Sequence, residues 1–380
     1  MNLISILILL GAGFITPSNP PLFEAQTIDD KVSIGYGLAI GDVDGDKKPD
    51  ILLADKKQFV WYRNGDWKRF VMIENLTEGD NVCIAARDID GDGKVEVAVG
   101  AQWVPSETSD TLKSGSVHYL IRPKDPTKLW TAIKLHHEPT VHRMKWVKTG
   151  KSYQLVVVPL HGRGNKNGEG NGVKIISYEM GKDPRKQWKY YVIDQSMHLT
   201  HNFDVNKFGA EIEPIHIAGK EGIKSFQFIN NRWEEYALES QVGNISFGEV
   251  RISDGFFASI SPMHGNELSV QELSLNNPSS RIVLTKDLNQ GHALATDDLL
   301  AFGLEQVIVG WREPNSEGKV GLKIFVSKNS NLSDWTDYWI DDNGVACEDL
   351  QLADLNGDGK KDVIASGRST HNLKIYWNKN

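Results

Sequence analysis

The chain has 380 residues, of which 40% are hydrophobic and 24% charged, and this ordinary globular composition excludes a disordered, collagen-like or coiled-coil architecture. Asp and Glu number 50 against 42 Lys and Arg, a net charge of −8, so we expect no nucleic-acid partner, because no basic excess is available to displace counterions from phosphates. The chain has two cysteines, Cys83 and Cys347, which excludes a disulfide framework and a thiolate zinc site.

The amino terminus carries a short apolar run from Leu3 to Leu10, followed by a polar break that begins at Thr16. The run is too short to span a bilayer, and its length is typical of the hydrophobic region of a secretory signal. We therefore predict a signal peptide over residues 1–20, export to the periplasm or the extracellular space, and one domain over 21–380. The alternative is a buried first strand. The rest of the sequence has no apolar stretch long enough to cross a membrane.

Three acidic segments, at 41–54, 88–100 and 354–366, resemble one another, and each ends in an apolar stretch with high strand propensity. Carboxylate or amide oxygens at relative positions 1, 3, 5 and 9, with glycines for the turn, match the oxygen ligands that Ca²⁺ prefers. No helical pattern flanks these loops, so each turn joins two strands. We expect structural Ca²⁺ sites that stiffen the hairpins, with the ligands Asp42, Asp44, Asp46 and Asp50; Asp88, Asp90, Asp92 and Glu96; and Asp354, Asn356, Asp358 and Asp362.

Degenerate copies of the same unit appear when the apolar stretch is used as the anchor, at 156–159, 215–218, 258–261 and 308–310. The chain then divides into seven units at intervals of roughly 44 to 59 residues. The units begin near Gly35, Asn81, Thr140, His198, Val242, Gly291 and Val345. Units of this length, built from short strands and turns, are typical of propeller blades. The sequence therefore predicts an all-β fold, a seven-bladed β-propeller.

Equivalent positions of the seven units should form rings, because the innermost strand of every blade lines one central channel. One ring contains Gly37, Cys83, His142, His201, a position near Asn244, His292 and Asp349. A second ring, just after the apolar stretch, contains Lys56, Gln102, His161, Lys220, His264, Arg312 and Arg368. A lone histidine on a strand is most often structural, but this convergence predicts a histidine-rich site at the mouth of the channel.

Clustered neutral imidazoles are good ligands for Zn²⁺ or a similar ion, and a three-histidine site with an open position is a catalytic arrangement. We expect a catalytic divalent ion to be held by some members of the set His142, His161, His201 and His264. The expected catalytic groups are His264 or His292 for proton transfer and Lys220, Arg312 and Arg368 for orienting the substrate. The expected substrate-binding residues are Arg163, in a glycine-rich polar loop, and Trp103 and Trp311, as platforms for stacking a sugar.

Such a site suits abstraction of a proton next to a carbonyl followed by loss of a β-oxygen, so the predicted chemistry is that of a metal-assisted carbon–oxygen lyase. Glycoside hydrolysis by two carboxylates is less well supported, although Glu249, Glu348 and Asp349 keep it open. The alternative from another class is a propeller that binds a carbohydrate or a protein without catalysis.

The acidic loops resemble FG-GAP or VCBS propeller repeats over nearly the whole chain. Six further segments resemble the propellers related to aldos-2-ulose dehydratase, a group that includes polysaccharide lyases: 161–170, 197–203, 262–266, 289–294, 309–312 and 347–350. The resemblance implies a metal-assisted dehydratase or lyase acting on an oxidised carbohydrate such as a keto-sugar. The fungal dehydratase carries further β domains after its propeller, whereas this sequence ends at Asn380, so the resemblance does not extend to an isomerase activity of those domains.

Overall fold

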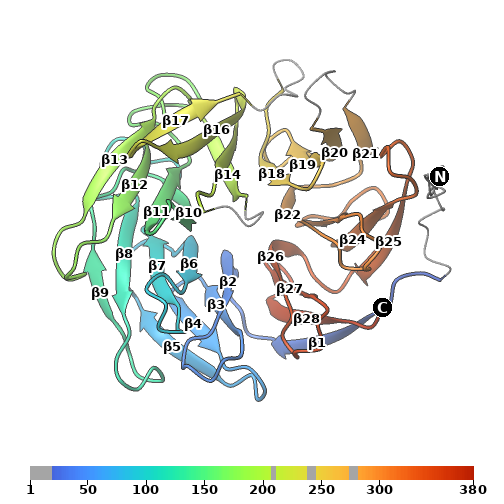
Figure 1. Cartoon of the computed structure of the whole chain (residues 1–380), viewed down its shortest axis with the longest axis horizontal. Coiled ribbons are helices and arrows are strands. Elements are labelled where there is room, and N and C mark those ends of the chain that lie inside the picture. Colours follow the sequence, from blue (N-terminus) through green and yellow to red (C-terminus); the bar gives the residue numbers. More distant parts are fainter. Residues whose placement is uncertain (1–18, 207–210, 238–244, 274–280) are drawn as a thin grey trace, which may run out of the picture.

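The structure, a computed structural model, describes residues 19–206, 211–237, 245–273 and 281–380. This part of the chain contains β-strands and no helix, and the strands form seven antiparallel sheets of four strands each. The sheets are arranged around a central axis as the blades of a propeller (Figure 1). The predicted all-β, seven-bladed propeller is therefore confirmed. The expected signal peptide lies almost wholly outside the described residues, and the described residues contain no helix able to span a membrane.

The four strands of each blade follow one another from the innermost to the outermost position. Blade 1 is β2 (Gly37–Gly41), β3 (Asp50–Ala54), β4 (Gln58–Tyr62) and β5 (Arg69–Glu74). Blade 2 is β6 (Cys83–Arg87), β7 (Glu96–Ala101), β8 (Ser116–Ile121) and β9 (Thr131–Lys134). Blade 3 is β10 (Val141–Lys148), β11 (Tyr153–Pro159), β12 (Ile175–Glu179) and β13 (Lys189–Asp194). Blade 4 is β14 (Thr200–Val205), β15 (Ile215–Gly219), β16 (Gly222–Ile229) and β17 (Arg232–Tyr236).

The last three blades have the same order from the axis outward. Blade 5 is β18 (Glu249–Ile252), β19 (Phe256–Ser261), β20 (Glu267–Glu272) and β21 (Ile282–Thr285). Blade 6 is β22 (Gly291–Asp297), β23 (Gln306–Trp311), β24 (Gly321–Ser327) and β25 (Trp335–Asp342). Blade 7 is β26 (Cys347–Ala353), β27 (Asp362–Gly367), β28 (Asn372–Asn378) and β1 (Phe23–Asp29).

The seventh blade takes its outermost strand from the other end of the chain. Strand β1 pairs antiparallel with β28, from Phe23 opposite Asn378 to Asp29 opposite Leu373. The first and the last strand of the described chain are therefore joined by a ladder of backbone hydrogen bonds, which closes the ring of blades (Figure 1).

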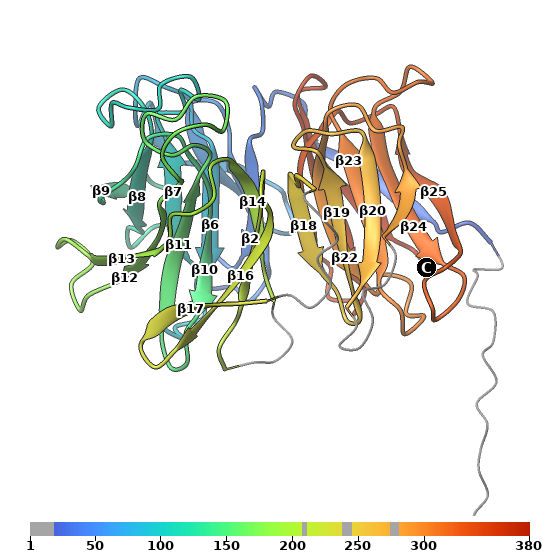
Figure 2. The ribbon, with the colours of Figure 1, turned by 90° about the horizontal axis from the view of Figure 1, so that it is seen from above.

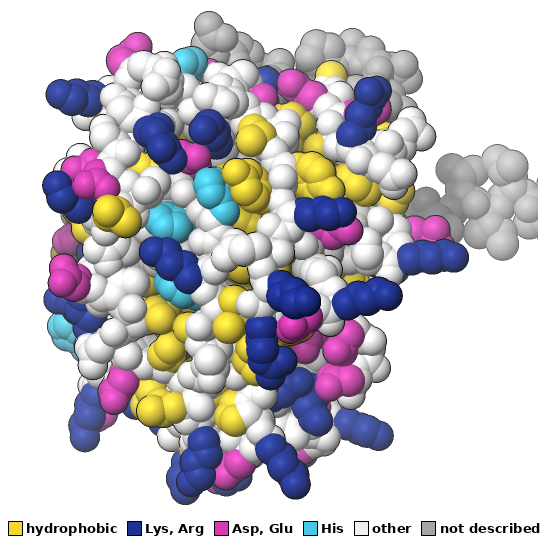
Figure 3. All heavy atoms as spheres, turned by 90° about the vertical axis from the view of Figure 1, so that its left-hand side faces the viewer, with side chains coloured by type: hydrophobic (Ala, Val, Ile, Leu, Met, Phe, Trp, Pro, Cys, Tyr) yellow, Lys and Arg dark blue, Asp and Glu magenta, His cyan; other side chains and the backbone are white. Residues whose placement is uncertain are grey.

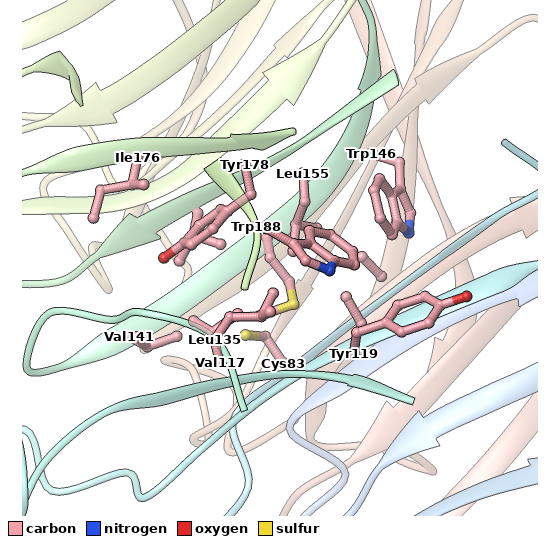
Figure 4. Packing of buried hydrophobic residues seen from close by; sticks show 14 of the residues in the cluster. Cys83, Val117, Tyr119, Leu135, Val141, Trp146, Leu155, Ile176, Tyr178 and Trp188 are labelled. Carbon is pink, nitrogen blue, oxygen red and sulfur yellow. The ribbon is translucent and has the colours of Figure 1, made fainter. Parts of the chain in front are cut away.

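The hydrophobic core lies between neighbouring blades, whose faces stack on one another. Second strands such as β11 are buried on both faces, which explains their continuous apolar runs, whereas the outer strand β13 is largely exposed. Between blades 2 and 3, Cys83 belongs to one buried cluster with large rings such as Trp146, Tyr178 and Trp188 (Figure 4). Cys83 and Cys347 are both buried and free. On the outer side of these blades, positive, negative and hydrophobic side chains are interspersed (Figure 3).

The antiparallel blades give the propeller two chemically different ends. The acidic loops connect first to second strands (β2 to β3, β6 to β7 and β26 to β27), so they lie where the innermost strands end. The predicted histidine positions lie where those strands begin. The innermost strands have four to eight residues, so at about 3.4 Å per residue they separate the two levels by roughly 14–27 Å. Figure 2 shows these strands running from one end of the propeller to the other. Between them lies a central cavity of about 720 Å³ lined by the innermost strands.

Candidate metal centre at one end of the central channel

Four innermost strands begin with an irregular register. The pairing shifts between Val141 and Arg143 in β10, between Thr200 and Phe203 in β14, between Gly291 and Ala293 in β22, and between Cys347 and Asp349 in β26. The residues within these shifts are His142, His201 with Asn202, His292 and Glu348. A β-bulge redirects the side chain of its extra residue, and here it does so at the same level of four blades.

Three histidines from three blades converge at this level. The ligand atoms of His201, His264 and His292 all lie within 4.8 Å of one another, and we call these residues the histidine trio. The Nε2 atoms of His201 and His264 are 2.8 Å apart, and the three ring centroids are separated by 4.6 to 5.1 Å. The trio therefore has the size of a site that can hold one metal ion.

His264 reaches the trio from the loop after β19, through an unusual backbone conformation. Its φ is 53°, a left-handed value that is unfavourable for a residue with a β-carbon. The surroundings hold it there, since the amide of Gly291, next to His292, donates to the carbonyl oxygen of Gly265 at 2.9 Å. This geometry turns the imidazole of His264 toward the axis, where the other two rings lie.

The second ring nitrogens fix the tautomers of the two buried members. Nδ1 of His201 lies 3.0 Å from Oε1 of Glu249 and 3.1 Å from the carbonyl oxygen of Gly248, and both of these atoms can only accept. Nδ1 of His292 lies 2.5 Å from the carbonyl oxygen of Glu348. Nδ1 therefore carries the proton in each neutral ring and Nε2 carries the lone pair, which is the arrangement that orients a histidine ligand toward a metal.

Burial keeps the trio neutral. It is the main cause that lowers the pKa of His264 to about 2, with His201 and Arg312 adding to the effect. Burial, reinforced by Arg312, also lowers the pKa of His292 well below its usual value. The pKa of His201 is lowered by burial although Glu249 acts in the opposite direction. Neutral imidazoles, with the Nε2 lone pairs of His201 and His292 fixed by these hydrogen bonds, fit a borderline ion such as Zn²⁺, so the trio can hold a metal.

A buried polar network supports His201 from behind. Glu249 accepts a hydrogen bond from Nδ2 of Asn202 at 2.7 Å and lies 3.3 Å from the guanidinium of Arg251. Burial opposes ionisation of Glu249, but the hydrogen bond from His201 and the charge of Arg251 outweigh it and hold its pKa below the usual range. The sequence analysis did not identify Asn202 or Arg251. The signal that could have found them is their position, since Asn202 directly follows His201 and Arg251 lies two residues after Glu249.

His142 and Trp103 lie beside the trio. The His142 ring packs against His201 at 4.7 Å, and its Nδ1 lies 2.7 Å from the carbonyl oxygen of His201, so its Nε2 also carries a lone pair. Trp103 also stacks on His142, with ring centroids 5.0 Å apart. His142 is not within the group of three ligands, so it is better placed as a neighbour of a metal than as a ligand.

Other residues predicted at the site lie apart from the trio. His161 forms a β-bridge with Leu199 and is outside the three-ligand group, although its local sequence matches that of His264. Trp311 is 1% exposed and packs in the core against Trp339, so its ring face is not available to a sugar. This placement does not fit the expected stacking role.

The predicted basic residues each have a carboxylate partner. Lys220 pairs with Glu169 and donates to the carbonyl oxygen of Gly168 at 3.0 Å, so it is tied to the glycine-rich loop. Arg163 is 2.9 Å from Glu138. Both residues therefore act first as anchors of this polar loop.

Arg312 and Arg368 share a single partner. Oε2 of Glu348 is 3.3 Å from Arg312, and Oε1 is 3.0 Å from Arg368. Arg312 also donates to Oε1 of Gln290 at 2.8 Å, and the Arg368 guanidinium lies over the ring of Tyr36, 5.5 Å from its centroid. These two arginines lie at the same end of the blades as the trio.

Two of the three acidic loops gather carboxylates closely enough to hold a cation. The groups are Asp42, Asp44 and Asp50, and Asp88, Asp90 and Glu96, each with ligand oxygens within 4.8 Å. In the described residues the third loop gives no such group. As in the first two loops, its carboxylates accept hydrogen bonds from backbone amides: Asp354 accepts from Gly357 at 2.7 Å, and Asp362 accepts from Leu355 at 3.1 Å. Asp46, Asp92 and Asp358 also accept amide hydrogen bonds within their own loops, and Asn356 donates to Asp358.

Burial raises the pKa of Asp50 and of Glu96 to about 7, against hydrogen bonds from backbone amides that lower it. Buried carboxylates of this kind gain a favourable partner when a cation binds. The first two loops therefore offer candidate cation sites, on the opposite end of the propeller from the trio.

Comparison with known proteins separates two parts of the chain. Residues 42–99 match the FG-GAP-like repeat family, and residues 114–272 match the family of the aldos-2-ulose dehydratase β-propeller domain. The aldos-2-ulose dehydratase of Phanerodontia chrysosporium is 23% identical over 268 residues, which cover 65% of this chain. The aligned part spans 29% of that enzyme.

Solved structures share the fold at low identity. The amino-terminal domain of BBS1 in complex with ARL6 superposes with a TM-score of 0.56 at 12% identity, covering 95% of this chain and 98% of that one. A chain of the mitotic checkpoint complex gives 0.58 at 10% identity, covering 100% and 97%. YCF48 bound to a D1 peptide gives 0.55 at 12% identity, covering 96% and 99%. The chain is thus a seven-bladed propeller in which residues 42–99 are similar to an FG-GAP-like repeat and residues 114–272 to the aldos-2-ulose dehydratase β-propeller domain, with distant sequence similarity to that dehydratase.

Proposed function

We propose that this protein is a metal-assisted carbon–oxygen lyase that acts on a keto-sugar or another oxidised carbohydrate at the histidine end of the channel. The observation that carries the proposal is the trio itself, in which three imidazoles from different blades converge with two Nδ1 atoms anchored. The distant similarity to aldos-2-ulose dehydratase supports the same reaction class. Since the aligned part spans 29% of that enzyme, its whole activity is not transferred with it.

In this proposal, Nε2 of His201, His264 and His292 would hold a divalent ion such as Zn²⁺, in agreement with the neutral state of the trio and with the fixed tautomers of His201 and His292. When bound, such an ion supplies Lewis-acid polarisation of a substrate carbonyl. A ligating Nε2 has no lone pair left for a proton, so the trio cannot also act as the base. We assign proton acceptance to His142, whose Nε2 carries a lone pair beside His201.

The reaction balances as a β-elimination. The C–H bond next to the carbonyl breaks, its proton passes to Nε2 of His142, and its electron pair forms a carbon–carbon double bond. The β-carbon–oxygen bond breaks, the oxygen leaves with its electron pair, and the proton held on His142 passes to that oxygen, directly or through water, which regenerates the neutral imidazole. Trp103, stacked on His142, offers its half-buried ring to the sugar.

Ultraviolet absorbance tests this function directly. Purified protein, with and without added Zn²⁺, is incubated with a panel of keto-sugars and uronic-acid polymers, and the unsaturated carbonyl product is followed by its absorbance. We expect a rise that depends on the metal and is lost in His142→Ala. Sugars left unchanged throughout the panel would instead favour a binding propeller without catalysis.

A further inference from the structure

The cations around the channel end are not equally neutralised. Lys220 has Glu169 as its partner, and Arg163 shares Glu138 with Lys174, whose Nζ is 3.3 Å from Oε1. Arg312 and Arg368, from blades 6 and 7, have one carboxylate between them.

That shared carboxylate is already fully engaged. Glu348 is 3% exposed at its side chain, and it gives one oxygen to Arg312 and the other to Arg368. In the described part of the chain, neither guanidinium forms an ion pair with another carboxylate. The cluster of Arg312, Glu348 and Arg368 therefore carries one net positive charge at a largely buried position. A buried charge without a counterion is unfavourable, so the cluster is suited to an anionic ligand.

The cluster is open toward solvent on the side of Arg368. The side chain of Arg368 is 37% exposed, whereas that of Arg312 is 11% exposed. Tyr36 supports the guanidinium of Arg368 from one face, and the hydroxyl of Tyr36 donates to Asp80 at 3.1 Å. Arg368 is therefore held in place while part of its donor edge stays accessible.

The cluster adjoins the trio through the backbone. Arg312 follows Trp311, which pairs opposite Gly291, the residue before His292. The carbonyl oxygen of Glu348 holds Nδ1 of His292 at 2.5 Å. Both arginines are also among the charges that lower the pKa of His264, after burial and the effect of His201. The cluster and the trio are therefore neighbours at this end of the propeller.

We propose that Arg312 and Arg368, braced by Glu348, form a subsite for the carboxylate of an acidic sugar. The inference rests on the proposed function, because it names the substrate class of the same site. A guanidinium presents a planar pair of N–H donors that matches the two oxygens of a carboxylate, and such charge-assisted bonds are stronger than those to a neutral hydroxyl. An acidic sugar would thereby place its ring against the trio.

Binding of an acid and of its ester tests the subsite without relying on turnover. Calorimetry would compare an oligoglucuronate with its methyl ester, which has the same ring but no charge. We expect the acid to bind at least about tenfold more tightly to the wild-type protein, as one charge-assisted contact allows. Arg368→Gln should abolish this preference. Arg185→Gln, which removes a guanidinium 67% exposed on blade 3, should keep it.

Equal affinities, a preference that Arg368→Gln retains, or no binding of either compound would overturn the subsite. Arg368 is chosen over the more buried Arg312 because its replacement is less disruptive to folding, and the acid-to-ester comparison in the wild-type protein needs no variant. The elimination assay separates the two proposals. Elimination from neutral keto-sugars with equal binding of acid and ester would refute the subsite alone, and preferred binding of the acid without any elimination would refute the proposed reaction alone.

Discussion

His201 is the member of the trio whose removal has the most defined consequences. It is 1% exposed, and it contacts Glu249 through Nδ1 and His264 through Nε2. His201→Ala removes one of the three expected metal ligands. Because the loss of a residue that only supports a ligand weakens metal binding by about 10 to 100-fold, we expect the metal affinity to fall by about 100-fold or more. It also removes a charge-assisted hydrogen bond to Glu249, so the free energy of unfolding should fall by about 3 kcal/mol without metal.

The assay combines three readings on the same preparations: metal per chain after dialysis against Zn²⁺, the urea midpoint, and turnover. Metal content and turnover should fall together in His201→Ala. The matched control is His198→Ala, three residues earlier, because His198 is 40% exposed and pairs with Glu221 at the surface. Its unfolding free energy should change by no more than about 0.5 kcal/mol. Normal turnover in a metal-depleted His201→Ala protein would refute the Lewis-acid role, and equal losses in both variants would refute the site.

Three further predictions address the periphery of the site and the scaffold. Asp90→Asn should reduce the rise in thermal midpoint that Ca²⁺ produces while leaving turnover intact; a matching loss of turnover would contradict a purely structural loop. Trp103→Ala should raise KM about threefold to tenfold through lost stacking, and an unchanged KM would exclude a sugar platform. Burial lowers the pKa of His216 from 6.5 to about 4. Between these pH values the unfolded chain binds more protons than the folded chain, so the free energy of unfolding falls as the pH drops from 6.5 to 4, and His216 accounts for about 3 kcal/mol of this fall. His216→Gln should remove that part of the acid sensitivity in urea titrations at pH 7.5 and 4.5, and an identical pH dependence in both proteins would show that His216 does not contribute.

The blade count was predictable because each blade repeats one physical unit. The buried second strand of every blade is an apolar run, and these runs survive in the middle of the chain where the acidic loops have been lost. The innermost strands begin within two residues of the predicted unit starts except in blade 5, where β18 begins at Glu249. The closure of blade 7 by β1 is harder to predict from the sequence, because the pairing of Phe23 with Asn378 joins opposite ends of the chain.

The bulges explain why the ring could be predicted only in outline. Counting back from the acidic loop of blade 7 gave Asp349 as the ring position, whereas the register shift places Glu348 at the level of His142 and His292. A bulge adds one residue on one strand, and residue spacing alone does not reveal it. Asp349 instead accepts the amide of Leu38 at 2.8 Å.

The two matching Pro-x-His-Gly sequences show a second limit. His264 adopts a left-handed backbone conformation and joins the trio, whereas His161 bridges to Leu199. The difference arises from contacts outside these four residues, since Gly265 is held by Gly291 of the next blade, while Gly162 lies against the backbone of Asn171 in the same loop of its own blade. Tertiary contacts of this kind decide a conformation that the local sequence leaves open.

Anomalous X-ray diffraction at the zinc edge, from crystals grown with Zn²⁺, would locate the bound ion. We predict a strong peak bonded to Nε2 of His201, His264 and His292, at about 2.0–2.1 Å from each nitrogen. Imidazoles that remain hydrogen-bonded to one another with no peak between them, or zinc found solely at the acidic loops, would contradict a catalytic metal centre at this end of the propeller.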